Sequence, residues 1–223
     1  MLKSIYSLKD LIYPVICMIC NTPGESICTN CRIPWLRQPK KSKIEKVDLY
    51  FAANYTPESS QLILAAKERG NKDAIDLLAS AISSSIKIAI YELKITGPIN
   101  LVTIPSKNLA IRRRGRDHIS ELALVVINQL KKVSIESSYQ PLLSITRKVK
   151  DQSGLNSQQR SENIKGAYIV KNSLIPQGEV ILIDDLITTG SSIQEGIRAL
   201  KAAEIAVSAV TTACAVGRNS LIR

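Results

Sequence analysis

The sequence predicts an α/β fold in which a parallel sheet is flanked by helices, with a small cysteine-bearing unit at the N-terminus. Three observations predict it. Strand-like and helix-like patterns alternate over most of the chain. A fully apolar run at 180–183 stops abruptly at two carboxylates, as a buried parallel strand does at its C-terminal end. Four cysteines form two C-x-x-C pairs ahead of the first strand.

Composition sets the limits. The 223 residues, 45% of them hydrophobic, are enough for one substantial core with a small appendage. The net charge of +11 suits an anionic partner such as phosphates or nucleic acid, and it is equally compatible with a solvated lysine-rich surface. No apolar run approaches the length of a membrane span and no signal peptide is visible, so we expect no membrane insertion and a cytoplasmic chain with reduced thiols. The oligomeric state is not indicated.

The chain divides into an N-terminal helix and ribbon (1–36), a polar, basic linker (37–46), the α/β core (47–217) and a short tail (218–223). Apolar residues at helical spacing predict helices over 2–12, 58–69, 72–93, 116–132 and 192–203. Short apolar stretches predict strands over 47–53, 99–104, 140–145, 165–170, 179–184 and 205–215. The polar stretch 146–163 reads as a long loop, of the kind that often serves as a mobile lid.

The cysteine pairs are spaced as Cys17-x2-Cys20-x7-Cys28-x2-Cys31. Each pair can place two thiolates on one ion, and the two pairs together complete a tetrahedral, structural Zn²⁺ site. The alternatives are a pair of disulfides, which a cytoplasmic chain disfavours, and redox chemistry, for which the thioredoxin-like pattern is missing. Cys214 lies in an apolar strand pattern and is expected in the core.

The segment after the apolar run is chemically suited to a phosphorylated ribose. Asp184 and Asp185 can hold sugar hydroxyls or a divalent metal. The turn that follows can offer backbone N–H groups, hydroxyls and a helix N-terminus to a phosphate, from Thr188, Thr189, Gly190, Ser191 and Ser192. Ser192 and Glu195 also fit a capping box, a purely structural interpretation that leaves the two acids unexplained.

A basic elbow follows the strand that ends at Pro105. Ser106 and Lys107 come first, and Arg112 and Arg114 can grip a polyphosphate at the same sheet edge as the aspartates. A solvated basic loop or a nucleic-acid patch remains the alternative. His118, the only histidine, is expected on a helix surface. The lid offers further cations at Arg147, Lys148, Lys150 and Arg160.

Residues 180–192 resemble the phosphoribosyl pyrophosphate (PRPP) signature of type I phosphoribosyltransferases. Over about residues 11–217 the chain is similar to one branch, the ComF (competence protein F) family. The cysteine ribbon, Lys67 with Arg69-Gly70, and Arg112-x-Arg114-Gly115 match that branch, as do Gln152-Ser153-Gly154-Leu155, Arg160, Asn163 and Gly166. Two places depart: Arg116-Asp117-His118 stands where Phe-Asn-Gln is usual, and Val149 and Asp151 replace a threonine and a proline.

The resemblance implies a type I phosphoribosyltransferase core with an N-terminal zinc ribbon. It implies that Asp184 and Asp185 engage the ribose hydroxyls as the catalytic acids, that Thr188 to Ser192 wrap the 5′-phosphate, and that Ser106-Lys107 meets the pyrophosphate with Mg²⁺. It links the chain to DNA uptake in natural transformation. The favoured hypothesis is an enzyme that transfers phosphoribosyl and releases pyrophosphate. The alternative is a non-catalytic competence factor that retains the phosphosugar site and binds single-stranded DNA beside other competence proteins.

Overall fold

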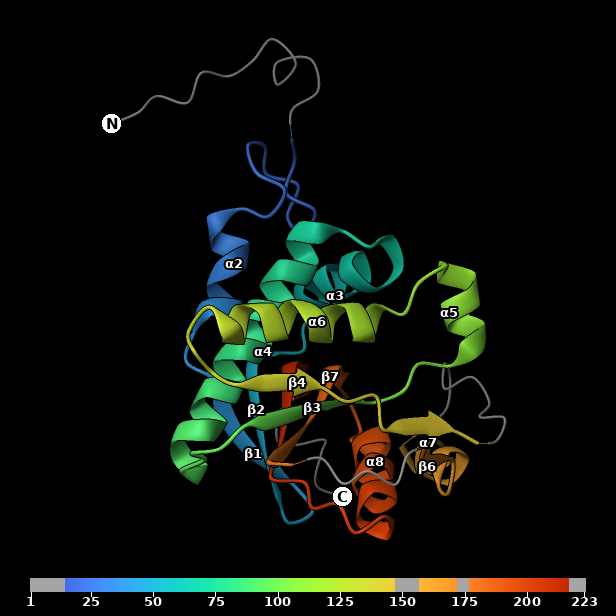
Figure 1. The fold of residues 1–223 in the computed structure, drawn as a ribbon. Coiled ribbons are helices and arrows are strands. Elements are labelled where there is room, and N and C mark those ends of the chain that lie inside the picture. Colours follow the sequence, from blue (N-terminus) through green and yellow to red (C-terminus); the bar gives the residue numbers. More distant parts are fainter. Residues whose placement is uncertain (1–14, 147–156, 172–176, 217–223) are drawn as a thin grey trace.

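A six-stranded, mainly parallel sheet forms the centre of the molecule, which confirms the predicted α/β class (Figure 1). The computed structural model of the chain describes residues 15–146, 157–171 and 177–216. The strand order is β1-β2-β8-β7-β3-β4, and all neighbours pair in parallel except β1 with β2. The strands are β1 (Lys40–Ile44), β2 (Val47–Asn54), β3 (Ile99–Thr103), β4 (Ser137–Tyr139), β7 (Glu179–Ile187) and β8 (Ala209–Ala215).

Helices cover both faces of this sheet. On one face pack α3 (Pro57–Arg69), α4 (Lys72–Leu93) and α6 (His118–Lys131); in Figure 1, α3 and α6 lie above the sheet and α4 descends along its left side. On the other face packs α8 (Ser191–Ala202), joined by α7 (Ser157–Ile164) and by the two-stranded antiparallel pair β5 (Leu143–Ile145) and β6 (Tyr168–Val170). Each face of the sheet has its own hydrophobic core, and successive side chains of β7 point to opposite faces. Ile181 and Ile183 pack in the core under α3, α4 and α6, and Val180 and Leu182 pack in the core on the α8 side.

Local signals fix the helix that leads into the site. Thr56 and Ser59 form a reciprocal capping box at the start of α3, with Pro57 in the first turn. Gly70 ends α3 in the left-handed conformation, and the side chain of Asn71 then caps α4. The break expected at Gly70-Asn71 is therefore present, and it places Lys67 in the last turn of α3.

The expected linker is wrong for residues 40–44, which form the edge strand β1. Ser42 and Ile44 are buried, while the three lysines of the strand, Lys40, Lys41 and Lys43, are exposed. Lys41 Nζ lies 3.0 Å from Asp48 and 2.6 Å from Glu92, so its charge is paired on β2 and α4. A lysine-rich composition looks like a linker, but it also suits an edge strand, where charge discourages pairing with other chains.

Several other boundaries are corrected. The strand expected at 140–145 covers only Leu143–Ile145 (β5), because Pro141 interrupts the run, and β4 (Ser137–Tyr139), in the other sheet, was not expected. The stretch read as a loop at 146–163 contains the start of α7, whose Ile164 is buried. Besides α7, two helices of the described residues were not expected: α2 (Thr29–Leu36) and α5 (Asn108–Arg114). The helix predicted over 2–12 lies outside the described residues.

The expectation about membrane-spanning length is also corrected. Among the described residues, α4 is long and apolar enough to cross a membrane by length and composition, with a mean hydropathy of 1.4. However, 56% of that segment is buried inside the protein, where α4 contacts α6, β2 and β8. Its apolar character is accounted for by its place in the core.

Candidate functional site

The predicted acids and the turn after them lie at the carboxyl end of β7. Asp184 and Asp185 lie within the strand rather than just beyond it, since β7 continues to Ile187. Gly190 then adopts a φ of 76°, a left-handed conformation that favours glycine, and α8 begins at Ser191. The hydroxyls of Thr189 and Ser191 lie 3.0 Å apart. All seven predicted residues of this segment are therefore brought together at one sheet edge.

The capping box expected at Ser192 and Glu195 does not form. Gly190 is the N-cap of α8, and no side chain caps the helix. Glu195 is buried, where it accepts a hydrogen bond of 3.0 Å from the backbone N–H of Tyr168 and pairs with Arg198. Glu195 thus ties β6 to α8 and leaves the first N–H groups of the helix without a side-chain cap.

Asp185 is held by two side chains from the helices above the sheet. Lys67 Nζ on α3 lies 3.3 Å from Asp185 Oδ2, and His118 Nε2 at the start of α6 lies 3.0 Å from the same oxygen. The Asp185 side chain is only 4% exposed. Neither contact was predicted from the sequence.

The two neighbouring acids have opposite pKa shifts. Burial raises the pKa of Asp184 well above its usual range, and the adjacent charge of Asp185 raises it further. Burial acts in the same direction on Asp185, but Lys67 and His118 outweigh it and hold the pKa of Asp185 below its usual range. The charge of Asp185 raises the pKa of Lys67 in turn. Asp185 is therefore the acid that stays ionised most readily.

The position of His118 corrects the expectation of a surface residue. It is buried, as the first residue of α6. A signal was available in the sequence, because His118 stands four residues before Leu122 and so shares the apolar face of the predicted helix. Its partner Asp185 lies 67 residues away along the chain, so no local pattern could reveal the contact.

The basic elbow follows β3, as predicted, but much of its charge is paired within the protein. Ser106 and Lys107 are half-buried and lead into α5. Arg114 is almost fully buried and lies 3.2 Å from Glu68 on α3, while Arg113 lies 3.1 Å from the same carboxylate. Arg112 is exposed. The expected polyphosphate grip is thus available from Arg112, whereas Glu68 already holds Arg114.

Arg116 joins the elbow to α3. Its guanidinium donates to the backbone carbonyls of Ala66 and Lys67, the latter at 3.1 Å, and pairs with Glu121. These carbonyls belong to the last turn of α3, where helices leave acceptors unpaired. Arg116 therefore fixes the helix end that carries Lys67. The predicted lid cations Arg147, Lys148 and Lys150, and the side chain of Arg160, lie outside the described residues.

The four N-terminal cysteines gather as the spacing predicts. The sulfur atoms of Cys17, Cys20, Cys28 and Cys31 all lie within 4.8 Å of one another, and Cys20 and Cys28 are 3.5 Å apart. In a tetrahedral zinc–thiolate site, neighbouring sulfurs stand about 3.8 Å apart, so this donor set fits a structural Zn²⁺. The backbone N–H of Cys28 donates to the Cys17 sulfur at 3.4 Å, as outer-shell donors to metal thiolates do.

The sequence model of the phosphoribosyl transferase domain matches residues 109–222, which is half of the chain. The chain belongs to the phosphoribosyl transferase domain family. This match covers the arginines of the elbow, β7, the turn and α8, and it agrees with the type I phosphoribosyltransferase-like fold predicted from the sequence. No curated protein matches the chain.

Solved structures that resemble this chain at low identity include phosphoribosyltransferases. The allosteric regulatory enzyme of purine biosynthesis is 16% identical, with a TM-score of 0.37, over 70% of this chain and 30% of its own. This chain therefore spans less than a third of that enzyme. Adenine phosphoribosyl transferase from Trypanosoma brucei, solved with AMP, pyrophosphate and ribose-5-phosphate, is 9% identical, with a TM-score of 0.38, over 78% of this chain and 88% of its own. Hypoxanthine-guanine phosphoribosyltransferase from Schistosoma mansoni, solved with IMP, is 13% identical, with a TM-score of 0.32, over 68% of this chain and 74% of its own.

Proposed function

We propose that this protein binds PRPP as its Mg²⁺ complex and transfers the phosphoribosyl group to an acceptor with release of pyrophosphate. The observation that carries the proposal is the arrangement at the end of β7. The buried acid Asp185 and the half-buried acid Asp184 are followed by a left-handed glycine turn and by a helix whose N-cap residue, Gly190, has no side chain to cap it. An uncapped helix N-terminus favours a phosphate, and adjacent acids favour sugar hydroxyls.

The proposed reaction breaks the bond between C1 of the ribose and the pyrophosphate oxygen, and a nucleophile then forms a new bond to C1. Mg²⁺ arrives with the pyrophosphate and is part of the substrate. The acids Asp184 and Asp185 orient the ribose and favour the positive charge that develops on the sugar. Ser106, Lys107 and the exposed Arg112 are proposed to meet the pyrophosphate, with the lid cations as further candidates.

Within this function we further propose membership of the ComF branch and a role in DNA uptake. The support is the resemblance of the ribbon, Lys67 and the elbow, together with the four-cysteine cluster. A four-thiolate Zn²⁺ site needs its cysteines reduced, which is consistent with a reducing compartment such as the cytoplasm.

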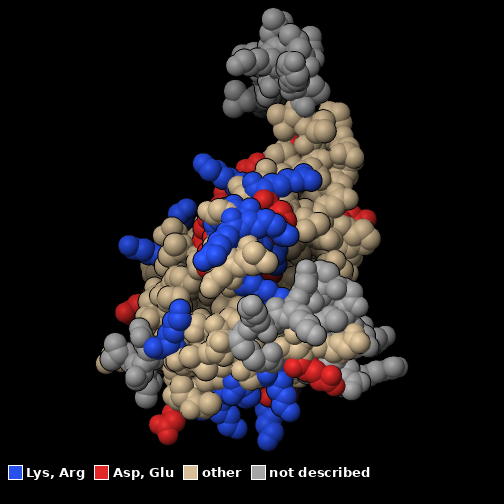
Figure 2. Space-filling model, turned by 90° about the vertical axis from the view of Figure 1, so that its right-hand side faces the viewer, with Lys and Arg blue, Asp and Glu red and all other residues tan. Residues whose placement is uncertain are grey.

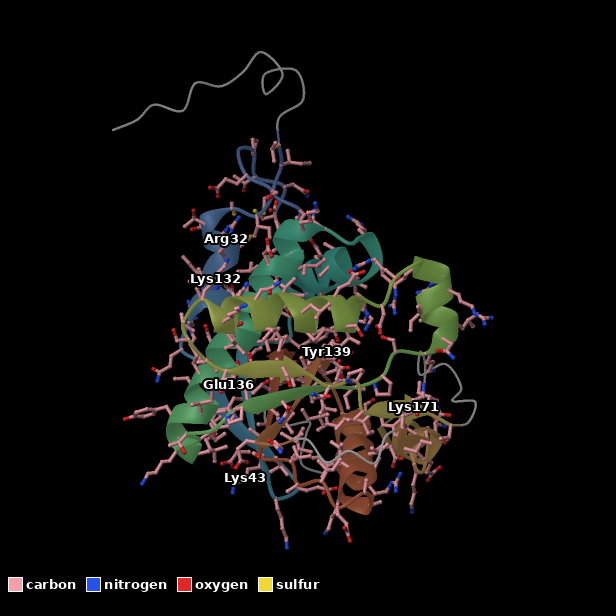
Figure 3. All side chains as sticks on the ribbon, in the orientation of Figure 1. Arg32, Lys43, Lys132, Glu136, Tyr139 and Lys171 are labelled. Carbon is pink, nitrogen blue, oxygen red and sulfur yellow. The ribbon has the colours of Figure 1, made fainter. Side chains whose placement is uncertain are left out.

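Calorimetric titration with PRPP and Mg²⁺ tests the proposal, followed by a search for released pyrophosphate across candidate bases and nucleic acids. The double variant Asp184→Asn with Asp185→Asn is expected to lose PRPP turnover. Glu136→Gln is the matched control, an exposed acid just ahead of β4 and remote from α5 (Figure 3). PRPP consumption that is the same in the double variant and the control would overturn the enzymatic proposal.

A second candidate function, binding of single-stranded DNA, is favoured by one surface feature. Figure 2 shows Lys and Arg side chains gathered over α5, where Arg112 and Arg113 are exposed. With few aromatic residues for base stacking, such binding would depend on phosphate contacts and fall steeply with salt. Affinity for a single-stranded oligonucleotide that does not change between low and moderate salt would exclude this candidate. PRPP binding without pyrophosphate release on any acceptor would favour it.

A further inference from the structure

The two acids of β7 differ in how the protein holds them. Asp185 Oδ2 meets two nitrogen atoms, Lys67 Nζ at 3.3 Å and His118 Nε2 at 3.0 Å. These side chains come from different helices, α3 and α6. Because a carboxylate can only accept, both nitrogens must donate, and the two bonds fix one oxygen from two directions.

Asp184 has no such clamp. Among the residues that the structure describes, no ion pair involves Asp184, and its Oδ1 accepts a hydrogen bond of 2.9 Å from the backbone N–H of Asp185. Alternation along β7 groups Asp185 with Ile181 and Ile183, on the face covered by α3, α4 and α6. The same alternation groups Asp184 with Val180 and Leu182, on the α8 side.

We propose that the two acids have different roles: Lys67 and His118 anchor Asp185 as a positioning residue, and Asp184 is the acid that meets the pentose. The identity of the pentose rests on the proposed function, whereas the anchoring of Asp185 does not. His118 is then a positioning residue as well, since its contact is with Asp185. This division of labour is not visible in the sequence, where the acids are adjacent and identical.

A chain of hydrogen bonds fixes the start of α6, where His118 stands, although no bond of this chain reaches the imidazole, whose buried Nδ1 has no hydrogen-bond partner among the described residues. Ser120 Oγ donates to Asp117 Oδ2 at 2.6 Å. Because the one proton of Ser120 is used there, the Tyr139 hydroxyl must donate to Ser120, 2.7 Å away, and the Thr103 hydroxyl must donate to Tyr139 at 3.1 Å. Tyr139 is the last residue of β4 and lies beside α6 (Figure 3). This chain connects β3, β4 and α6, and it holds the residue next to His118 in place.

The last turn of α3 is fixed in a comparable way. Arg116 donates to the backbone carbonyl of Lys67, and Arg113 and Arg114 hold the neighbouring Glu68. Both anchors of Asp185 therefore stand on fixed backbone: the elbow arginines hold the last turn of α3, and the hydrogen bonds through Ser120 and Tyr139 hold the start of α6. The pKa directions agree with this arrangement, because a firmly paired Asp185 stays charged and disfavours charge on Asp184. An approaching ligand with hydroxyl donors would offset that cost at Asp184.

The first test compares the two acids one at a time. Asp185→Asn is expected to lower the unfolding temperature by several degrees, because it leaves the partly buried Lys67 without its partner. Asp184→Asn is expected to leave that temperature unchanged or raise it, since the amide removes a buried acid that lacks a cation. Both variants are expected to lose PRPP affinity. Equal unfolding temperatures for the two variants would overturn the division of roles.

The second test uses the fact that His118 is the only histidine, so that its ring nitrogens give unambiguous ¹⁵N NMR signals. We expect the Nε2 signal to be that of a hydrogen-bonded donor, and to move in Asp185→Asn but not in Asp184→Asn. A signal that responds equally to both substitutions, or to neither, would overturn the anchoring contact.

The third test replaces His118. His118→Leu removes the donor and is expected to weaken PRPP binding roughly ten- to a hundredfold, the range for a lost hydrogen bond to a charged group. His118→Gln, whose amide can donate to Asp185, is expected to restore most of the affinity. Equal affinity in the leucine, glutamine and unaltered proteins would overturn the positioning role.

These tests separate two kinds of failure. Absence of PRPP binding by the unaltered protein would overturn the proposed function, and the NMR and unfolding measurements would still decide whether Asp185 is anchored. PRPP binding by the unaltered protein, together with equal unfolding temperatures for Asp184→Asn and Asp185→Asn, would uphold the proposed function and overturn the inference.

Discussion

Removing the predicted Zn²⁺ from the four-cysteine cluster is expected to release α2 and expose Trp35. Cys28 is the N-cap of α2 and Cys31 lies in its first turn, so two of the four ligands hold the start of this helix. The helix has eight residues, contains Pro34 and lacks a side-chain cap, which makes it marginal on its own. Its stability therefore depends on the cluster and on the packing of Trp35.

The magnitude follows from what α2 buries. Trp35 is 2% exposed and Ile27 is fully buried, and both belong to the core formed by α3, α4 and α6. Losing a buried Trp from a core costs about 3–5 kcal/mol. In a protein of this size each kcal/mol corresponds to about 2–4 °C, so we expect the unfolding temperature to fall by about 6–20 °C.

The assay is tryptophan fluorescence, because Trp35 is the only tryptophan. Chelation, or the substitution Cys28→Ser, is expected to shift its emission to longer wavelength as water reaches the indole. Cys214→Ala is the matched control, since Cys214 is buried on β8 apart from the cluster. Loss of about one metal ion per chain with unchanged emission and unfolding temperature would refute the reasoning.

Three further predictions concern the site. Because the pKa of Asp185 is lowered in the folded protein, its contribution to stability is present above the unfolded-state pKa and is lost as the pH falls through the lower folded-state value. Lys67→Met should raise the folded-state pKa of Asp185 and so move the midpoint of acid unfolding, followed by circular dichroism, to higher pH. An unmoved midpoint would contradict the ion pair. Gly190→Ala should destabilise the protein by about 1 kcal/mol or more, because Gly190 has a positive φ that alanine adopts only with strain, and it should also weaken PRPP binding. Calorimetry measures both effects, and an alanine variant as stable as the parent would contradict this reasoning. Arg116→Ala should destabilise the protein by about 1–3 kcal/mol in urea unfolding, because it leaves backbone carbonyls unpaired at the end of α3. Lys132→Ala, at an exposed position, is the control and should leave the stability unchanged.

Much of the fold follows from local pattern. The apolar period of 72–93 predicts α4 with its observed bounds, and the run at 180–183 predicts the central strand β7. The doubled C-x-x-C spacing predicts the cysteine cluster, because ligand geometry is encoded by short separations in the chain. The edge strand β1 escaped prediction since its lysines resemble a linker, and only pairing with β2 reveals it.

The candidate site divides in the same way. Asp184, Asp185 and the turn from Thr188 to Ser192 are contiguous, so one short segment predicts that they meet. Lys67 and His118 lie 118 and 67 residues from Asp185, and no period or spacing relates positions so far apart. Arg114 was predicted to face a ligand, but its partner Glu68 comes from another helix.

By itself, the sequence determined the α/β class, the cysteine cluster and the place of the acidic segment at a sheet edge, because each depends on residues close together in the chain. The tertiary structure alone decided which acid is anchored, which arginines are already paired and that the lone histidine contacts Asp185. The physical reason is that charge pairing and desolvation depend on distances between helices and strands. Those distances exist only once α3 and α6 have packed over β7.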